Sequence, residues 1–229
     1  MRGRGEVYRC EANSVEGFVQ QLAVAYIAKG YRFYVACRIP PHKDPSSVDR
    51  KLVARYGLGI SRWTRARRKR QGVAGVQYLR YRRFFVLIAT HGKHEFFGHE
   101  RRFRDIREKP IGFVGYSIGC RTGRDGRHHV SVEIHRDSLR KLKDHLERVA
   151  LRWDVEQLIQ LFQVLGFAPY ARVRRQLLKL LSHVNDRRRR AGLESVPWSA
   201  VRWRRRSVSP FVRADCVVPG IADSAARIP

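Results

Sequence analysis

Basic residues are concentrated in one stretch, residues 61–90, which holds nine of them and no acidic residue. The first part of this stretch reads SRWTRARRKRQ and predicts a helix over residues 62–71 that Ser61 caps. Such a polar helix cannot be buried, and guanidinium and ammonium groups without acidic partners are suited to phosphate. We therefore expect the helix to contact a nucleic-acid backbone, through Arg62, Arg65, Arg67, Arg68, Lys69 and Arg70.

The second part of the stretch reads VAGVQYLRYRRFFVLIAT and predicts two strands with a bend near residues 80–83. Residues 84–89 are apolar on both faces, which indicates a central strand of the core. Tyr78, Arg80 and Arg82 combine an aromatic ring with cations, as in surfaces on which unpaired bases stack. We expect these three side chains to face nucleic acid.

A second basic region lies near the C-terminus, where residues 181–210 carry a net charge of +6 against +9 for residues 61–90. It contains an arginine run and an arginine-tryptophan run, whose candidate binding residues are Arg187, Arg188, Arg189, Arg190, Arg202, Trp203, Arg204, Arg205 and Arg206. Because charge is so unevenly distributed, the working hypothesis is one binding groove lined by both regions.

The histidines suggest a metal site. His91, His94, Glu95 and His99 follow the predicted central strand within nine residues, and a metal ion would need a further ligand such as His129 or His135. Their spacing matches no standard zinc motif, so the alternative is that they are loop histidines that bind phosphate or are merely exposed. The cluster would serve a nuclease or strand-transfer enzyme that uses a divalent metal ion.

A nucleophilic tyrosine is a further alternative. Single-strand endonucleases of replication and transposition pair a tyrosine with two histidines in an H-x-H motif, which this sequence lacks. Tyr170, which precedes an arginine-rich helix, is the better candidate and Tyr116 the second. Glu95 and Glu133 are weak candidates for carboxylate chemistry. No Walker loop, dinucleotide-binding motif or serine-hydrolase motif is present, which argues against those classes.

Composition limits the partners. The 229 residues carry a formal net charge of +28, which favours a polyanionic partner, and 43% hydrophobic residues are enough for a core. The four cysteines form no C-x-x-C pair, which argues against a zinc ribbon and favours a reducing compartment. With no apolar stretch of about 20 residues and no signal-peptide pattern, we expect a soluble protein of the cytoplasm, or of the nucleus in a eukaryote, that is not secreted and has no membrane partner.

Several elements must position these residues. Helical periodicity and capping signals predict helices over residues 13–29, 46–57, 62–71, 139–153 and 154–166, and a long helix that begins at Pro169. Alternation predicts a strand over residues 31–39 and a hairpin formed by residues 111–120 and 128–135. From Ala191 onward the periodicity fades and prolines recur, which predicts an extended, partly ordered arm.

We predict an α+β fold, with a mixed or antiparallel sheet of about five strands flanked by helices, followed by a C-terminal helical segment and a basic arm. The expected parts are residues 1–137 as the nucleic-acid-binding body, 138–190 as helices packed on it, and 191–229 as the arm.

Three function classes remain open. The first is a nucleic-acid-binding protein, with RNA or single-stranded DNA favoured because aromatic residues accompany the arginines. The second is a metal-dependent nuclease or strand-transfer enzyme, and the third a structural ribonucleoprotein component. The chain is similar in general character to proteins of mobile elements and of ribonucleoprotein particles, although no motif assigns a family. A protein partner in such a complex is a further expectation.

Overall fold

The structure is a computed structural model that describes residues 8–211, apart from the side chain of Arg62. Within these residues it has an α+β fold with seven α-helices and two antiparallel sheets. The helices are α1 (Val15–Gln20), α2 (Pro45–Arg55), α3 (Arg62–Arg70), α4 (Glu95–His99), α5 (Arg136–Val149), α6 (Val155–Val164) and α7 (Ala171–Arg190). The strands are β1 (Phe33–Arg38), β2 (Val76–Tyr81), β3 (Phe84–Ala89), β4 (Arg104–Asp105), β5 (Ile111–Phe113), β6 (Tyr116–Thr122) and β7 (His128–Ile134).

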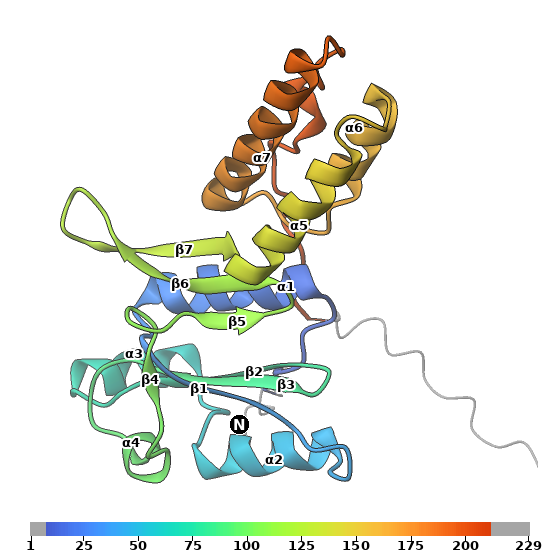
Figure 1. The fold of residues 1–229 in the computed structure, drawn as a ribbon. Coiled ribbons are helices and arrows are strands. Elements are labelled where there is room, and N and C mark those ends of the chain that lie inside the picture. The colour runs from blue at the N-terminus through green and yellow to red at the C-terminus, as the bar shows by residue number, and fades with distance from the viewer. Residues whose placement is uncertain (1–7, 212–229) are drawn as a thin grey trace, which may run out of the picture.

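One helix lies between the two sheets (Figure 1). It starts as α1, continues as the π-helix η1 (Gln21–Tyr26) and ends as the 3-10 turn η2 (Ile27–Lys29) at Gly30, whose φ is 94°. Ser14 caps it by accepting a hydrogen bond from the Gly17 amide. Phe18, Leu22 and Ile27 are fully buried, and the helix touches β2 of one sheet and β7 of the other. A helix with apolar side chains on several faces is stable only when it packs against other elements on more than one side, here against both sheets.

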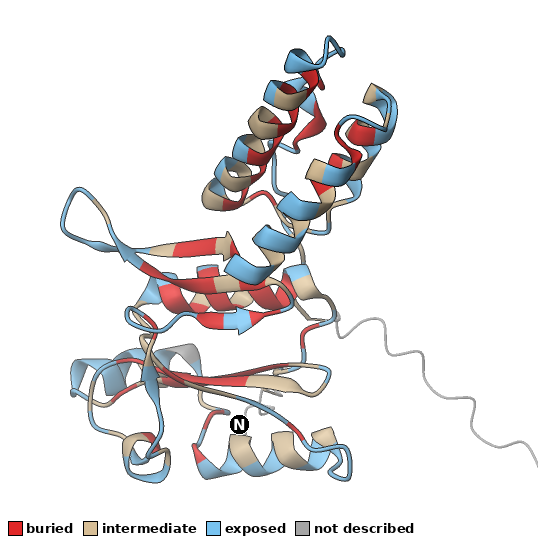
Figure 2. Ribbon diagram, in the orientation of Figure 1, coloured by how far each residue is buried: buried red, intermediate tan, exposed pale blue. Residues whose placement is uncertain are grey.

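The larger sheet has the strand order β2-β3-β1-β4. Its central strand β3 coincides with the predicted residues 84–89, and both of its faces are in the core, as expected. Val86 and Ile88 pack toward the helix between the sheets, whereas Leu87 and Ala89 belong to a second cluster with α2 and α4. Figure 2 shows this sheet buried along its middle.

The smaller sheet has the order β5-β6-β7, and β6 and β7 form the predicted hairpin. Its Phe113 stacks at 4.2 Å on Phe18 and at 5.1 Å on Phe84, measured between ring centroids. These contacts join the two sheets at one end of the central helix.

The prediction of a single sheet of about five strands was wrong. The strands divide into sheets of four and three because the apolar helix at residues 15–29 occupies the space between them. The alternation of each strand gives its inward face, but it does not reveal which strands share a sheet.

The three C-terminal helices stand together beyond the smaller sheet (Figure 1). Asp154 and Gln157 form the expected capping box at the start of α6. Gln176 of α7 fixes this group to the sheet, because its amide bonds both the N–H and the C=O of Ile134 in β7, at 2.8 and 3.1 Å. Within residues 8–211, no helix combines the length and apolarity needed to span a membrane.

Candidate nucleic-acid interface

The C-terminal segment, residues 196–211, does not extend away from the molecule as a loose arm. Its Val196, Ala200 and Val201 are buried, and the 3-10 turn η3 (Trp198–Ala200) packs against α6. The described part of the predicted arm is therefore packed against the helices at these residues. Residues 212–229, the rest of the predicted arm, lie outside the described residues.

Two carboxamide side chains hold the segment near its two ends. Asn185 of α7 donates to the Val196 carbonyl at 2.9 Å and accepts from the Val196 amide at 2.8 Å. Gln20 of α1 does the same for Val208, at 2.6 and 3.3 Å. Each clamp satisfies both polar groups of one backbone residue, which fixes its position and orientation.

Gly17 allows the far end of the segment to lie close to α1. A Cβ atom at this position would meet the Pro210 Cα at 3.0 Å, and the Pro210 carbonyl accepts from the Asn13 amide at 3.0 Å. The segment thus passes from the C-terminal helices to the start of the helix between the sheets.

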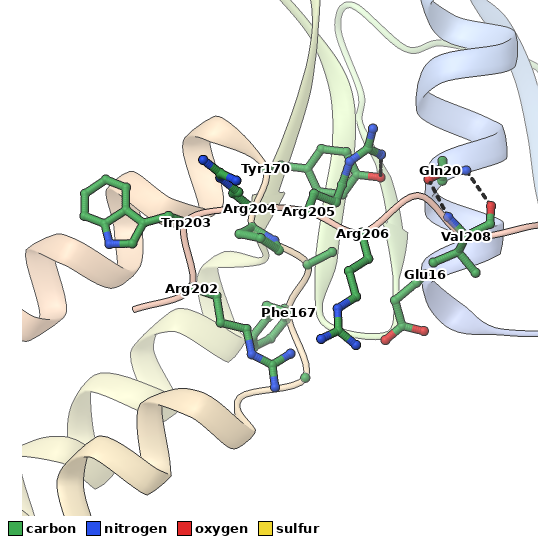
Figure 3. A pocket seen from close by; sticks show the side chains of 13 residues that line it. Glu16, Gln20, Phe167, Tyr170, Arg202, Trp203, Arg204, Arg205, Arg206 and Val208 are labelled. Carbon is green, nitrogen blue, oxygen red and sulfur yellow. Dashed lines mark hydrogen bonds between the residues drawn. The ribbon is translucent and has the colours of Figure 1, made fainter. Parts of the chain in front are cut away.

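Between the two clamps the segment lines a cavity of about 730 Å³, here called the arginine cavity (Figure 3). Its other walls are residues 166–170 and the Glu16 and Gln20 side chains of α1. The arginines that line it are Arg202, Arg204, Arg205 and Arg206, all of them exposed. Figure 3 shows the Arg202 and Arg206 side chains on one side of the segment, near Phe167, and Arg205 turned to the other side, over Tyr170.

A buried tyrosine supports the wall opposite the arginines. Tyr116 accepts a hydrogen bond from the Ala168 amide at 2.7 Å, and its ring packs edge-on against Phe167 at 5.1 Å. Burial raises the pKa of Tyr116 to about 12. Tyr116 is 1% exposed, so its hydroxyl serves the fold and is not accessible as a nucleophile.

Next to the arginine cavity lies a groove of about 380 Å³, here called the tryptophan groove. Trp198 and Trp203 form one side, with 52% and 51% of their surface exposed, and the outer face of α7 forms the other. The residues that α7 contributes are Ala171, Arg174, Arg175, Leu178, Lys179 and Ser182. Because Trp203 lines both hollows, the groove and the cavity are adjacent.

The arginines of the cavity are not neutralised within the described part of the chain. No ion pair of residues 8–211 involves Arg202, Arg204, Arg205 or Arg206. Glu16 is the one carboxylate among the lining residues, so the cavity has a formal charge of +3. Together with the exposed tryptophans, this arrangement offers cations for phosphates and flat rings for bases.

Helix α3 has the predicted character. It is capped by Ser61, as expected, and the side chains of Arg67, Arg68, Lys69 and Arg70 are exposed, as is 83% of Trp63. Arg65 is half-buried and donates to the Ile60 carbonyl at 2.8 Å. Nothing is described of the Arg62 side chain. None of the ion pairs among the described side chains involves Arg65, Arg67, Arg68, Lys69 or Arg70, so the charge of these residues also remains available.

The expectation that Tyr78 and Arg80 are exposed was wrong. Tyr78 is fully buried and Arg80 is 3% exposed, because this face of β2 is covered by α2 and by residues 10–12. Asp49 of α2 accepts from the Tyr78 hydroxyl at 2.6 Å and from Arg80, which also binds Glu11 at 2.7 Å. Arg82 differs: it lies at the hairpin turn with a φ of 53° and remains exposed.

In this buried network, Asp49 and Glu11 keep Arg80 charged, and Asp49 keeps the Tyr78 hydroxyl protonated. Burial alone would lower the pKa of Arg80, but its hydrogen bonds to Asp49 and Glu11 raise it above the usual value. Burial and the bond to Asp49 raise the pKa of Tyr78. Arg80 is thus a paired, structural cation.

The arginine run at the end of α7 does not form a shared surface. Arg188 falls on the buried stripe of the helix, and its guanidinium donates to the carbonyls of Ala150 and Trp153, both at 2.8 Å, near the C-terminal end of α5. The Nε atom of Arg187 is buried, and Arg189 pairs with Asp186 at 2.8 Å. Arg190 is exposed. Helical periodicity thus corrects the prediction for Arg188.

The histidine cluster does not converge. Among the described residues, no three His, Cys, Asp or Glu side chains are placed to hold a metal ion. His94 caps α4 by accepting from the Phe96 amide at 3.0 Å, while the His91 ring lies against Phe33. His99 lies near the Tyr56 ring. The metal-dependent alternative therefore has no assembled ligand set at this place.

Tyr170 lies in the arginine cavity. Its hydroxyl accepts from Arg205 at 2.9 Å, and the same guanidinium lies 4.7 Å above its ring. Burial raises the pKa of Tyr170, and Arg205 partly offsets this. The tyrosine thus positions an arginine. Glu133 on the smaller sheet is bound by Ser131 and by Arg121, at 2.7 and 2.8 Å.

The hypothesis of one groove lined by both basic regions is not supported. The arginine cavity and the tryptophan groove contain no residue of α3. Figure 1 shows α3 beside the larger sheet, whereas the C-terminal segment runs from α7 to the start of α1. The two charge peaks form two separate surfaces.

Sequence reasoning missed the contribution of α7 to the tryptophan groove. Arg174, Arg175 and Lys179 remain on the polar face once the buried positions Val173 and Leu177 are assigned, so helical periodicity could have found them. It could not have found Gln20, which lies 188 residues from its partner Val208.

Comparison with protein-family models, with curated proteins and with solved structures finds no match to this chain.

Proposed function

We propose that this protein binds nucleic acid, with single-stranded RNA or DNA as the favoured ligand, through the arginine cavity and the tryptophan groove. The observation that carries the proposal is the adjacency of four arginines without ion-pair partners in residues 8–211 to two half-exposed tryptophans. Arginine forks bind phosphates, and tryptophan rings stack on bases of any sequence.

Two features support single strands over duplex. A base must be unstacked to lie against Trp198 or Trp203, which a duplex does not offer without distortion. The groove volume of about 380 Å³ lies at the lower end of the range of small-molecule sites, about 300–1,000 Å³, which suits one or two bases better than a duplex. The formal charge of +28 supports a polyanionic ligand in general.

We place the protein in a mobile-element or ribonucleoprotein system, as a binding component and not as a metal-dependent nuclease. Among the described residues, His91, His94 and His99 form no metal-ligand set, which favours a binding component over a metal-dependent nuclease. The placement in such a system follows from the charge and general character of the sequence. Sequencing the nucleic acid that is retained after purification at moderate salt tests it. One defined RNA would favour a ribonucleoprotein component.

Fluorescence anisotropy with a labelled oligonucleotide over a salt series tests the binding site. The variant Arg202→Gln, Arg204→Gln, Arg206→Gln should weaken binding and reduce the slope of log K against log salt by about 0.7 for each phosphate that is no longer neutralised. A matched control, Arg124→Gln, Arg127→Gln, Arg136→Gln, removes three exposed arginines that have no side-chain hydrogen bond among the described residues. Equal losses of affinity in both variants, or binding that does not depend on salt, would contradict the proposal.

A further inference from the structure

We infer that the arginine cavity binds the phosphorylated end of a nucleic-acid strand, with the adjoining nucleotide stacked on Trp203. This inference depends on the proposed function and specifies its ligand.

The charge of the arginine cavity suits a terminal phosphate. Four arginines and one glutamate leave the cavity with a formal charge of +3. An internal phosphodiester carries one negative charge, whereas a terminal phosphomonoester carries about −1.5 to −2 at pH 7 and offers three acceptor oxygens. A terminal phosphate therefore matches the cavity better, both in charge and in the number of hydrogen bonds that several guanidinium groups can donate.

One side of the cavity is closed where the segment meets α1. There the segment is tied to α1 by the two hydrogen bonds between Gln20 and Val208, and the Glu16 side chain of the same helix extends to the side on which Arg206 lies (Figure 3). A strand that continued past this point would bring its phosphates toward a carboxylate and into a helix. Like charges repel, so the cavity favours a strand that ends there.

The tryptophan groove leads into the cavity past Trp203. Trp203 belongs to both hollows, and its carbonyl accepts a hydrogen bond from Arg174 at 2.6 Å. That bond ties the backbone next to the tryptophan to α7. A strand can thus lie in the tryptophan groove, stack a base on Trp203 and place its terminal phosphate among the arginines.

Arg202 and Arg206 are the arginines best placed for this role. They extend on the same side of the segment near Phe167 (Figure 3), and neither side chain has a hydrogen-bond or ion-pair partner within residues 8–211. Arg205 already donates a hydrogen bond to the Tyr170 hydroxyl and lies over the Tyr170 ring. Both candidate residues are exposed, so the fold should tolerate their substitution.

The test compares oligonucleotides of about six nucleotides, within the site sizes of single-strand-binding folds, that differ only at their ends. Each carries an internal fluorescent base, and the ends are 5′-phosphate, 3′-phosphate or hydroxyl on both. One phosphorylated form should bind about tenfold or more tightly than the dihydroxyl form, because its added charge gains hydrogen bonds from arginine. Which form is favoured gives the direction of the strand.

The variant Arg202→Gln, Arg206→Gln should abolish this preference, and the control Arg124→Gln, Arg127→Gln should keep it. The preference should also decline below about pH 6, where the phosphomonoester gains a proton. Equal affinity for phosphorylated and hydroxyl ends would overturn the inference and leave the proposed function standing. Failure of every oligonucleotide to bind would instead contradict the proposed function.

Discussion

Arg80 is buried and paired with two carboxylates, so its charge is not available to bind a ligand. Its side chain is 4% exposed and is bound by Asp49, itself 13% exposed, and by Glu11, which is 58% exposed. The two carboxylates therefore differ in how much they matter. Asp49 also holds the Tyr78 hydroxyl, so it is the group that satisfies most of the buried polarity.

We expect Asp49→Ala to lower the free energy of unfolding by about 3–5 kcal/mol, because it leaves a buried guanidinium without its best partner. Glu11→Ala is the matched comparison and should cost about 1 kcal/mol or less, because this carboxylate is largely solvated. Urea unfolding followed by circular dichroism measures both. Equal costs for the two substitutions would contradict the assignment of Asp49 as the principal partner.

His94 gives the stability a dependence on pH. Burial lowers the pKa of His94 below its usual value, while its Nδ1 atom caps α4. Since the unfolded state takes up the proton first, the contribution of His94 to stability is complete above the unfolded pKa of about 6.5 and is lost as pH falls through the lower folded pKa.

The variant His94→Asn keeps a capping acceptor and removes the titration. We expect the wild type to lose stability relative to this variant as the pH falls from about 7 to 5, where the unfolded histidine protonates. Chemical unfolding at a series of pH values checks this. A stability difference that does not change over this interval would show that His94 does not titrate with unfolding.

Single residues were predictable from sequence where the environment was local. The strand at residues 84–89 and the Ser61 cap follow from neighbouring residues alone, and both were confirmed. Tyr78 and Arg80 were misplaced because their exposure depends on Asp49, which lies 29 and 31 residues away. Alternation along β2 shows which side chains share a face, but not what covers that face.

Three carboxamide clamps organise the elements of the C-terminal half. Gln176 joins α7 to β7, Asn185 joins it to Val196, and Gln20 joins α1 to Val208. In each, one side-chain amide bonds both polar groups of a single backbone residue. Two of the clamps, Asn185 and Gln20, hold the C-terminal segment, which pairs with no strand among the described residues. An extended segment can thus be positioned without belonging to a sheet.

Removing one clamp should free the segment without unfolding the core. We expect Gln20→Ala to raise the rate of trypsin cleavage at residues 202–206 on the order of tenfold, because two hydrogen bonds of about 1 kcal/mol each no longer oppose local opening. The cleavage sites are identified by mass spectrometry. Gln163→Ala, at an exposed position of α6, is the control. Unchanged cleavage in Gln20→Ala would argue that the clamp does not hold the segment.

Element boundaries were predictable to within a few residues for most helices, because caps and periodicity are local signals. The α6 capping box and the end of the first helix at Gly30 are examples. The division into two sheets was not predictable, since it results from a helix whose burial on several sides requires long-range partners. The three carboxamide clamps could not be predicted from the sequence either, because an uncharged Asn or Gln side chain gives no charge or periodicity signal for its partner.

At the scale of the whole molecule, the two basic surfaces lie apart. Helix α3 stands beside the larger sheet (Figure 1) and presents cations with Trp63, whereas the C-terminal segment presents its arginines between residues 166–170 and α1. A ligand long enough to reach both would be held at two places. A short ligand would occupy one, and the groove next to the arginine cavity favours the C-terminal site.

This separation predicts a dependence on ligand length. Two variants remove equal charge: Arg67→Gln, Arg68→Gln, Arg70→Gln on α3, and Arg202→Gln, Arg204→Gln, Arg206→Gln on the C-terminal segment. An oligonucleotide of about six nucleotides should lose affinity only with the second variant, whereas one of about forty, well beyond the site size of one binding fold, should lose affinity with both. Anisotropy titrations at one salt concentration measure this.

The physical reason is that each surface neutralises its own phosphates, and the number of counterions released depends on how many phosphates the protein neutralises. With the long ligand, the reductions in binding free energy from the two variants should add to within about 0.5 kcal/mol, because the surfaces share no residue. If the short oligonucleotide responded to the α3 variant as strongly as to the other, the two surfaces would have to form one site. That result would support the prediction, made from the charge distribution, of one groove lined by both basic regions.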